Sequence, residues 1–418
     1  MRVPGLDSGP RRFVIARALS RSGDTVFPIG LAAAMLQKDF SASDVGVVMG
    51  ASLAPVVLLM PFGGVILDHF NPKTPMVVAD VVRTVLQGVL AALLLAGPPP
   101  LWQILVPALA SGAAQAFFQP GVSNMLRQLA PDRLRQSNAT VRTVESVVSL
   151  GAPALAGVVI AVTDAAAVIA LDACTFAASA WLLAGIRLGS GPVAAAPKFW
   201  GQLREGWHEF TARPWLWSVV SVFSLFGLVV FGPFDVLKAV VLIDRFGASA
   251  YAWLISGFSL GAVLGGLLAL RASPGRPLRT GLLTLLGFTP LPVVISFDLP
   301  AALVAVAMIA GGAANAYWAV MWSTSVQSHA PPHVLSRITA YDMIGSIGLM
   351  PVGRALTGAA AGYIGTATVL SMSSVALLVG CMALLLVPAV RTLPAVQLPR
   401  GASSPAEPTS NALEARDA

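Results

Sequence analysis

The chain has 418 residues, of which 11% are charged and 56% hydrophobic, and its formal net charge is +7. A soluble domain carries about 25% charged residues, so the composition excludes an ordinary soluble protein. Apolar runs of about 20 residues, the length that crosses a bilayer, recur along nearly the whole chain. We therefore predict an all-α polytopic membrane protein.

Taken in chain order, the apolar runs predict twelve transmembrane helices. They lie near 13–36, 42–67, 75–96, 101–126, 139–162, 166–186, 215–241, 249–270, 278–297, 300–327, 338–362 and 366–390. The longest polar interval between them, 187–214, divides the spans six and six.

The basic residues fall almost entirely on one side of these spans. If the N-terminus is cytoplasmic, the outward loops hold only Lys38 and Arg245. This bias is the positive-inside rule for cytoplasmic loops, so the net charge requires no nucleic-acid partner. We expect both termini to be cytoplasmic. The Ala-, Gly- and Arg-rich composition suggests a bacterium and its cytoplasmic membrane.

The chain divides into four parts. Residues 1–187 and 215–390 form two six-helix bundles, 188–214 is a linker, and 391–418, rich in Pro, Ala and Ser, is a disordered cytoplasmic tail. Aromatic residues recur at helical spacing in the linker stretch "KFWGQLREGWHEF", which favours an amphipathic helix on the membrane surface. A disordered linker with scattered aromatics is the alternative.

Three repeated sequence features relate the two halves. "ASGAAQAFF" at 110–118 is repeated as "AGGAANAYW" at 310–318, "GASL" in the second span as "GFSL" in the eighth, and Pro153 has a counterpart in Pro351. Two halves related by an axis along the membrane normal are a known transporter construction. The small residues allow neighbouring helices to approach closely.

These features resemble the major facilitator superfamily. The loop "GGVILDHFNPK" carries Gly64 and Asp68 at the spacing of the family motif and a basic end at Lys73, although positions 69, 71 and 72 depart from it. "SGDTVFPIGLA", "AFFQPGVSNMLRQLAPDRLRQSNA", "LDACTFAASA" and "SRITAYDMIGSIGLMPVG" are similar to the macrolide-efflux and enterobactin-exporter branch.

The resemblance implies the major facilitator fold, in which two pseudo-symmetric six-helix bundles alternate access to a central site. It also implies a latch that holds the two halves together in the outward-open state. The candidate latch residues are Gly64, Asp68, Lys73, Asp80 and Arg83, joined by Arg337 or Asp342 across the interface.

A glycine-proline stretch in the fifth span resembles a motif of exporting branches. "SLGAPALAG" offers Gly151, Pro153 and Gly157, at a spacing that departs from the family's. Small residues and a missing hydrogen bond predict a thin, kinked helix packed against its counterpart in the other half, near Pro351. A kink that is only structural is the alternative.

Asp24 is the most deeply placed carboxylate, roughly 16 Å from the start of the first span by the helical rise. An ionised group at that depth is expensive, so it faces a cavity or a partner. Arg21 lies on about the same face. We predict that Asp24 exchanges a proton or cation; a permanent Arg21–Asp24 pair is the alternative.

Other charges inside the spans are weaker candidates. Asp172 either titrates or forms hydrogen bonds between helices, and Glu145 is more simply paired with Arg142 than involved in coupling. Asp235 and Lys238 are expected to form a solvated pair at the outer rim. Arg354 has no acid nearby in sequence, so it requires a partner in space, a carbonyl or an anionic group of the substrate.

The duplicated segment predicts a cavity for a bulky amphiphile, since such cavities are mostly apolar with a few polar groups. Packing between helices is the alternative for each aromatic residue. The candidates are Gln115, Phe117, Phe118, Asn315, Tyr317, Trp318, Trp322 and Arg354.

The sequence contains no nucleotide-binding glycine-lysine loop and no nucleophile–base pair. His329 and His333 are separated by two prolines, so a metal site is not expected. We expect neither an enzyme nor a cofactor. The prediction is a monomeric secondary transporter, a proton-coupled exporter of a hydrophobic or amphipathic small molecule. An importer of a nutrient or siderophore and a transport-inactive scaffold are the alternatives.

Overall fold

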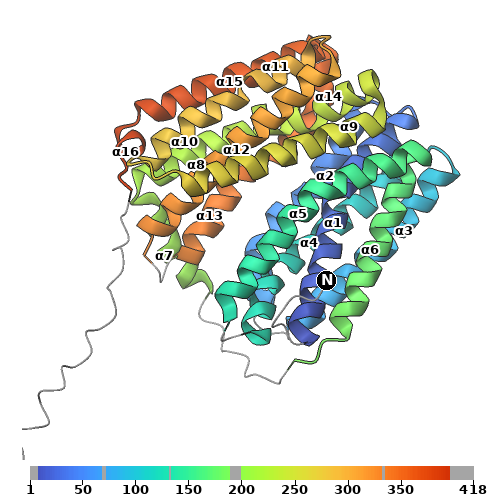
Figure 1. Ribbon diagram of the computed structural model, residues 1–418, viewed down its shortest axis with the longest axis horizontal. Coiled ribbons are helices and arrows are strands. Elements are labelled where there is room, and N and C mark those ends of the chain that lie inside the picture. Colours follow the sequence, from blue (N-terminus) through green and yellow to red (C-terminus); the bar gives the residue numbers. More distant parts are fainter. Residues whose placement is uncertain (1–7, 68–71, 131–132, 189–198, 332–334, 396–418) are drawn as a thin grey trace, which may run out of the picture.

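The computed structural model describes residues 8–67, 72–130, 133–188, 199–331 and 335–395. Within these ranges every regular element is a helix, which confirms the predicted all-α class. Figure 1 shows the helices in two groups that converge at one end and diverge at the other.

The first group contains six helices in chain order. They are α1 (Ser8–Gln37), α2 (Ala42–Leu67), α3 (Lys73–Ala96), α4 (Leu101–Leu129), α5 (Leu134–Val162) and α6 (Ala165–Ala184). We call this group the N-terminal bundle.

The second group, the C-terminal bundle, is preceded by α7 (Phe199–Thr211). It consists of α8 (Pro214–Phe226), η2 (Gly227–Phe231), α9 (Gly232–Arg271), α10 (Pro277–Leu285), η3 (Leu286–Phe288), α11 (Pro290–Ser296), α12 (Ala301–His329), α13 (Leu335–Ile347), α14 (Met350–Ile364), α15 (Thr366–Leu386) and α16 (Pro388–Arg391).

The described helices account for twelve membrane crossings. Nine segments are long and apolar enough to span a bilayer by length and composition. One of them, 214–271, has 58 residues and reverses at Gly247 (φ 82°), so it crosses twice. The charged helix α1 and the consecutive pair α13 and α14 supply the remaining two. The predicted spans are therefore confirmed to within a few residues at most ends.

Three spans are interrupted in ways that the sequence analysis did not predict. The seventh contains the π-helical η2, the ninth the 3₁₀-helical η3, and the eleventh breaks between α13 and α14. Pro233, Pro290 and Pro351 follow these breaks, and each lacks the N–H that would bond four residues back. The hydroxyl of Ser373 in α15 donates to the Val229 carbonyl (2.8 Å), the group that Pro233 leaves without its helical donor.

The repeated segments 110–118 and 310–318 each pack closely against the second repeated segment of their own bundle. A Cβ at Gly112 of α4 would collide with the carbonyl oxygen of Ser52 in "GASL", and one at Gly312 of α12 would collide with that of Phe258 in "GFSL". The chain repeats both motifs because each half uses one against the other to bring two helix backbones together.

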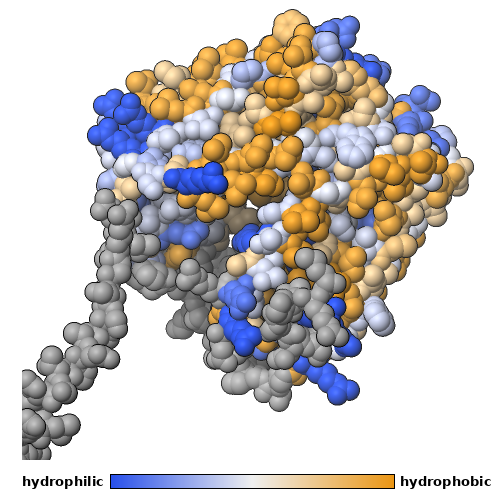
Figure 2. Space-filling model, in the orientation of Figure 1, coloured by the Kyte–Doolittle hydropathy of each residue, from blue (hydrophilic) through white to orange (hydrophobic). Residues whose placement is uncertain are grey.

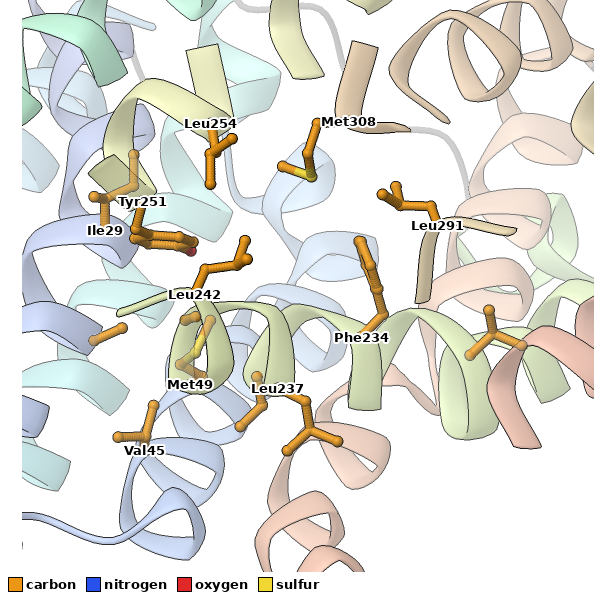
Figure 3. Close-up of a cluster of buried hydrophobic side chains, with 14 of the residues drawn as sticks. Ile29, Val45, Met49, Phe234, Leu237, Leu242, Tyr251, Leu254, Leu291 and Met308 are labelled. Carbon is orange, nitrogen blue, oxygen red and sulfur yellow. The ribbon is translucent and has the colours of Figure 1, made fainter. Parts of the chain in front are cut away.

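The two bundles touch where they converge. In α2, Gly46 approaches the Arg354 carbonyl of α14 so closely that a Cβ would lie 2.5 Å from it, and Gly50 is similarly close to Pro351. Figure 3 shows Val45 and Met49 of α2 in one buried apolar cluster with α9 residues, which joins the two bundles. At the diverging end, the surface is hollowed between the bundles (Figure 2).

The linker helix is present as α7, so a disordered linker is wrong for this segment. Its residues Trp207 and Phe210 form a ring cluster with Tyr341 of α13, with centroids 5.5–5.8 Å apart. The linker is therefore fastened to the eleventh span. The predicted tail beyond residue 395 lies outside the described residues.

Candidate functional site

A cavity of about 440 Å³ lies within the C-terminal bundle. This is the size range of small-molecule sites. Residues from the seventh to the eleventh spans line it, among them Phe223, Phe231, Phe234, Asp235, Lys238, Phe258, Phe288, Asn315, Trp318, Trp322, Asp342 and Ser346. The interrupted elements η2 and η3 and the break before Met350 border this cavity.

One wall of the cavity is an aromatic stack. Phe223 stacks on Trp318 with centroids 5.1 Å apart, and Trp318 stacks on Trp322 at 5.9 Å. The Trp322 indole N–H donates to Asp342 Oδ2 at 2.9 Å, and the Ser346 hydroxyl donates to Asp342 Oδ1 at 3.1 Å. The wall thus combines a large apolar face with one carboxylate.

The duplicated segment contributes to the cavity unequally. Asn315, Trp318 and Trp322 line it, whereas Tyr317 is buried against Ala269 and Met321, so its predicted place in the cavity is wrong.

In the N-terminal half, Phe118 is 1% exposed within the bundle core and lies under the Arg17 guanidinium, so it is a packing residue. Phe117 is half-buried and does not line the C-terminal cavity. Gln115 is 3.5 Å from Asp24 Oδ1 and is therefore associated with the charged cluster described below.

Asp235 is shared between two cations beside the cavity. Its Oδ1 accepts from Lys238 Nζ at 2.5 Å and its Oδ2 from Arg354 Nη2 at 2.6 Å. All three side chains are less than a fifth exposed, so the predicted solvated pair at the rim is wrong. The seventh span continues to Phe246, which places Asp235 about 16 Å from its end.

Arg354 also reaches the other bundle. Its Nη1 donates to the Met49 carbonyl of α2 at 3.2 Å. The sequence indicated that Arg354 needs a partner that is distant in the chain. The structure provides two, the Asp235 carboxylate and the Met49 carbonyl. This side chain connects the cavity to the contact between the bundles.

A second group of charges is buried inside the N-terminal bundle. Asp24 of α1 forms an ion pair with Arg83 of α3, and each side chain is 3% exposed. The alternative of a permanent Arg21–Asp24 pair is therefore wrong, because the partner of Asp24 is Arg83.

Two more carboxylates lie beside this pair. Asp80 of α3 accepts a hydrogen bond from Ser179 of α6 at 2.6 Å. Asp172 is fully buried, and neither of its oxygens has a hydrogen-bond partner among the described residues. A Cβ on Gly23 would collide with Asp172 Oδ1. The Arg83 guanidinium covers the Phe176 ring at 3.7 Å.

Glu145 of α5 pairs mainly with Arg17 of α1, at 2.7 Å, while Arg142 is 3.8 Å away and 85% exposed. The predicted pair between Glu145 and Arg142 is present, but Arg17 is the closer partner of Glu145.

The latch candidates are dispersed in this structure. Asp80 and Arg83 lie inside the N-terminal bundle and bind residues of that bundle, and Asp342 lines the cavity. The latch was predicted for the outward-open state, and it stays a prediction. Lys73 Nζ donates to the Ala184 and Ile186 carbonyls at 2.8 Å. Asp68 and the side chains at Gly64 and Arg337 lie outside the described residues.

The fifth span packs on the eighth, not on the eleventh as predicted. A Cβ at Gly157 would lie 3.1 Å from the Ser249 carbonyl, and the Ser249 hydroxyl donates to the Gly157 carbonyl at 2.8 Å. Gly151 has open space around it, and Pro153 is buried. Pro351 instead faces Gly50 of α2.

No cluster of three metal-ligating side chains occurs among the described residues. The arrangement therefore consists of an aromatic cavity, a shared carboxylate that bridges to the bundle contact, and a buried charge cluster.

The Major Facilitator Superfamily model matches residues 13–350, so the chain belongs to this superfamily of transporters. It is 23% identical over 401 residues to the multidrug efflux pump Tap of Mycolicibacterium fortuitum, covering 92% of this chain and 97% of that one.

It is also 22% identical to macrolide efflux protein A of Streptococcus pyogenes, over 60% of this chain and 64% of that protein, which is less than two thirds of its length.

Two solved transporters share the fold. The nucleoside transporter NupG superposes with a TM-score of 0.72 at 14% identity, covering 90% of this chain and 98% of that one. A POT family transporter in complex with 5-aminolevulinic acid gives 0.73 at 12% identity, covering 93% and 98%. Similarity at this level of identity shows the fold alone.

Proposed function

We propose that this transporter exports a hydrophobic or amphipathic small molecule from a bacterium in exchange for protons. The observation that carries the proposal is the 440 Å³ cavity with its aromatic wall and few polar groups. Such a lining favours a bulky, largely apolar ligand over a small hydrophilic nutrient. The names of the efflux relatives, macrolide and multidrug, agree with this ligand class.

The proposed orientation places both termini in the cytoplasm, as the basic loops indicate. The end at which the bundles diverge then faces the cytoplasm, and the contact between α2 and α14 closes the outer side. In this state the site receives its ligand from inside the cell. Export proceeds as residues 1–187 rock against 215–390, within one chain acting as a monomer.

Proton coupling is assigned to the buried cluster in the N-terminal bundle. If all three were ionised, Asp24, Asp80 and Asp172 would place three negative charges around Arg83, while Arg17, the other buried cation near Asp80, is paired with Glu145. Uncompensated charge in such an interior is costly, so protons are the simplest additional neutralising species. Loss and gain of these protons would change the attraction among α1, α3 and α6, and with it the position of α1.

The test is a susceptibility panel in a bacterial host that lacks its own efflux pumps. Cells expressing the transporter are challenged with macrolides, dyes, siderophores and lipophilic cations. Protection by the wild type, abolished by a protonophore, supports proton-coupled export. Unchanged susceptibility to every compound despite membrane expression would reject export of these classes and favour the importer or the scaffold.

A further inference from the structure

The charge of Asp342 in the cavity wall is not neutralised by a described side chain. Its two oxygens accept hydrogen bonds from Trp322 and Ser346, which are neutral donors. No Lys or Arg nitrogen of a described side chain lies within 4.0 Å of it, the limit for an ion pair. A carboxylate at membrane depth requires a partner.

The cations beside the cavity are already engaged elsewhere. Lys238 and Arg354 both bind Asp235, and Arg354 also binds the Met49 carbonyl. Neither is therefore available to Asp342 in this conformation. The positive charge that Asp342 lacks is therefore supplied by a proton or by a bound cation.

The surroundings of Asp342 suit a particular partner. The half-buried Trp322 indole holds the carboxylate through its N–H, at the electropositive edge of the ring. Trp318 is 4% exposed and stacks on both Phe223 and Trp322, so it supports the Trp322 ring from behind. A cation over an indole face gains about 0.5–2 kcal/mol, more when desolvated. Aromatic faces and an uncompensated carboxylate together select positive charge.

We propose that Asp342 and Trp322, with Trp318 stacked behind Trp322, form the recognition site for the cationic group of an amphipathic organic cation. The apolar body of this ligand occupies the phenylalanine-lined part of the cavity, at Phe231, Phe234 and Phe288. The inference rests on the proposed export function and specifies its substrate class. An inorganic cation is disfavoured because much of the lining is aromatic carbon.

Two ions of nearly the same shape and opposite charge test this site. Tetraphenylphosphonium and tetraphenylborate are titrated into the purified full-length protein by calorimetry, with empty micelles as the blank. We expect the wild type to bind the phosphonium at least tenfold more tightly than the borate. Equal affinity for both ions, or tighter binding of the borate, would overturn the cation site.

Three variants assign the preference to Asp342. Asp342→Asn keeps the size and the hydrogen-bond acceptor and is expected to lose the tenfold preference, while Asp342→Glu keeps the charge and is expected to retain it. The matched control is Asp298→Asn, whose carboxylate is fully exposed in a loop and paired with Arg245. A preference that survives in a folded Asp342→Asn protein would overturn the assignment.

The outcome is separable from that of the export proposal. If the wild type protects cells against neutral or anionic compounds but binds both test ions equally, export stands and the cation site is wrong. If the phosphonium is bound selectively but no compound is exported, the site stands and the export proposal fails.

Discussion

Arg354 of α14 donates a hydrogen bond to the main-chain carbonyl of Met49 in α2, 305 positions away in the sequence. The same guanidinium binds Asp235, a residue of the cavity wall. One of the contacts that join the two bundles at their converging end is thus made by a side chain whose other partner faces the cavity. A charged ligand that disturbs Asp235 would loosen the contact between the bundles.

The first prediction concerns this bridge. Arg354→Gln removes the charge that spans the interface while Lys238 still neutralises Asp235, so the converging end should open more often. Spin labels at Pro98 and Tyr363, exposed positions at that end of the two bundles, should show a longer distance population. Arg271→Gln, an exposed substitution far from the interface, should leave the distribution unchanged, and an unchanged Arg354→Gln distribution would contradict the role of Arg354.

The second prediction concerns the Asp24–Arg83 pair. Asp24→Asn leaves the Arg83 guanidinium buried without its counter-ion, a change that typically costs about 3–5 kcal/mol. Thermal melting in detergent should fall clearly for the single variant and recover in part for Asp24→Asn with Arg83→Gln. A double variant less stable than Asp24→Asn alone would show that the pair is not a unit.

The third prediction concerns Gly23. An added methyl group at this position meets Asp172 Oδ1 and lies 2.8 Å from Thr175 Oγ1, so Gly23→Ala should destabilise the N-terminal bundle by about 1–3 kcal/mol. Gly151→Ala is the matched control, since nothing lies within 4 Å of its added carbon. Equal melting temperatures for the two variants would argue against the close approach of α1 and α6.

The fourth prediction concerns the repeat. Gly112→Ala and Gly312→Ala place a methyl group against the carbonyl of the neighbouring helix in each half, so both should lower the melting temperature and the yield of folded protein. Gly257→Ala, with ordinary spacing of 3.7 Å to Ile309, should be tolerated. Tolerance of either Gly112→Ala or Gly312→Ala would mean that the two contacts are not equivalent.

The sequence predicted the number and limits of the spans because hydrophobic length is a local property of the chain. It also predicted the internal repeat, and the structure supplies the reason, since Gly112 and Gly312 occupy equivalent contacts. The breaks in the spans were missed. Their proline signals were present, but proline is also tolerated in unbroken membrane helices, so sequence alone could not separate the two cases.

The partners of the buried charges were the least predictable part. The three-residue spacing on one helix favoured Arg21 as the protein partner of Asp24. The observed partner is Arg83, which lies as many residues from the end of α3 as Asp24 lies from the end of α1. Depth matching could have suggested this pair, but the choice among helices at equal depth requires the three-dimensional packing.

The cavity was predicted in part. Asn315, Trp318 and Trp322 line it, but Tyr317, which is adjacent to Trp318, is buried against Ala269 and Met321 in a separate small cluster. The rotation of α12 decides between these two positions, and a helix with apolar residues on all sides gives no periodic signal for its rotation.

The most direct test of proton-coupled export uses purified protein in liposomes with a pH-sensitive dye inside. A gradient of a substrate identified in the susceptibility panel is imposed. We expect protons to move in the opposite direction in the wild type and in Asp298→Asn, and we expect no proton movement in Asp24→Asn. Substrate movement without any proton movement in the wild type would contradict proton-coupled export.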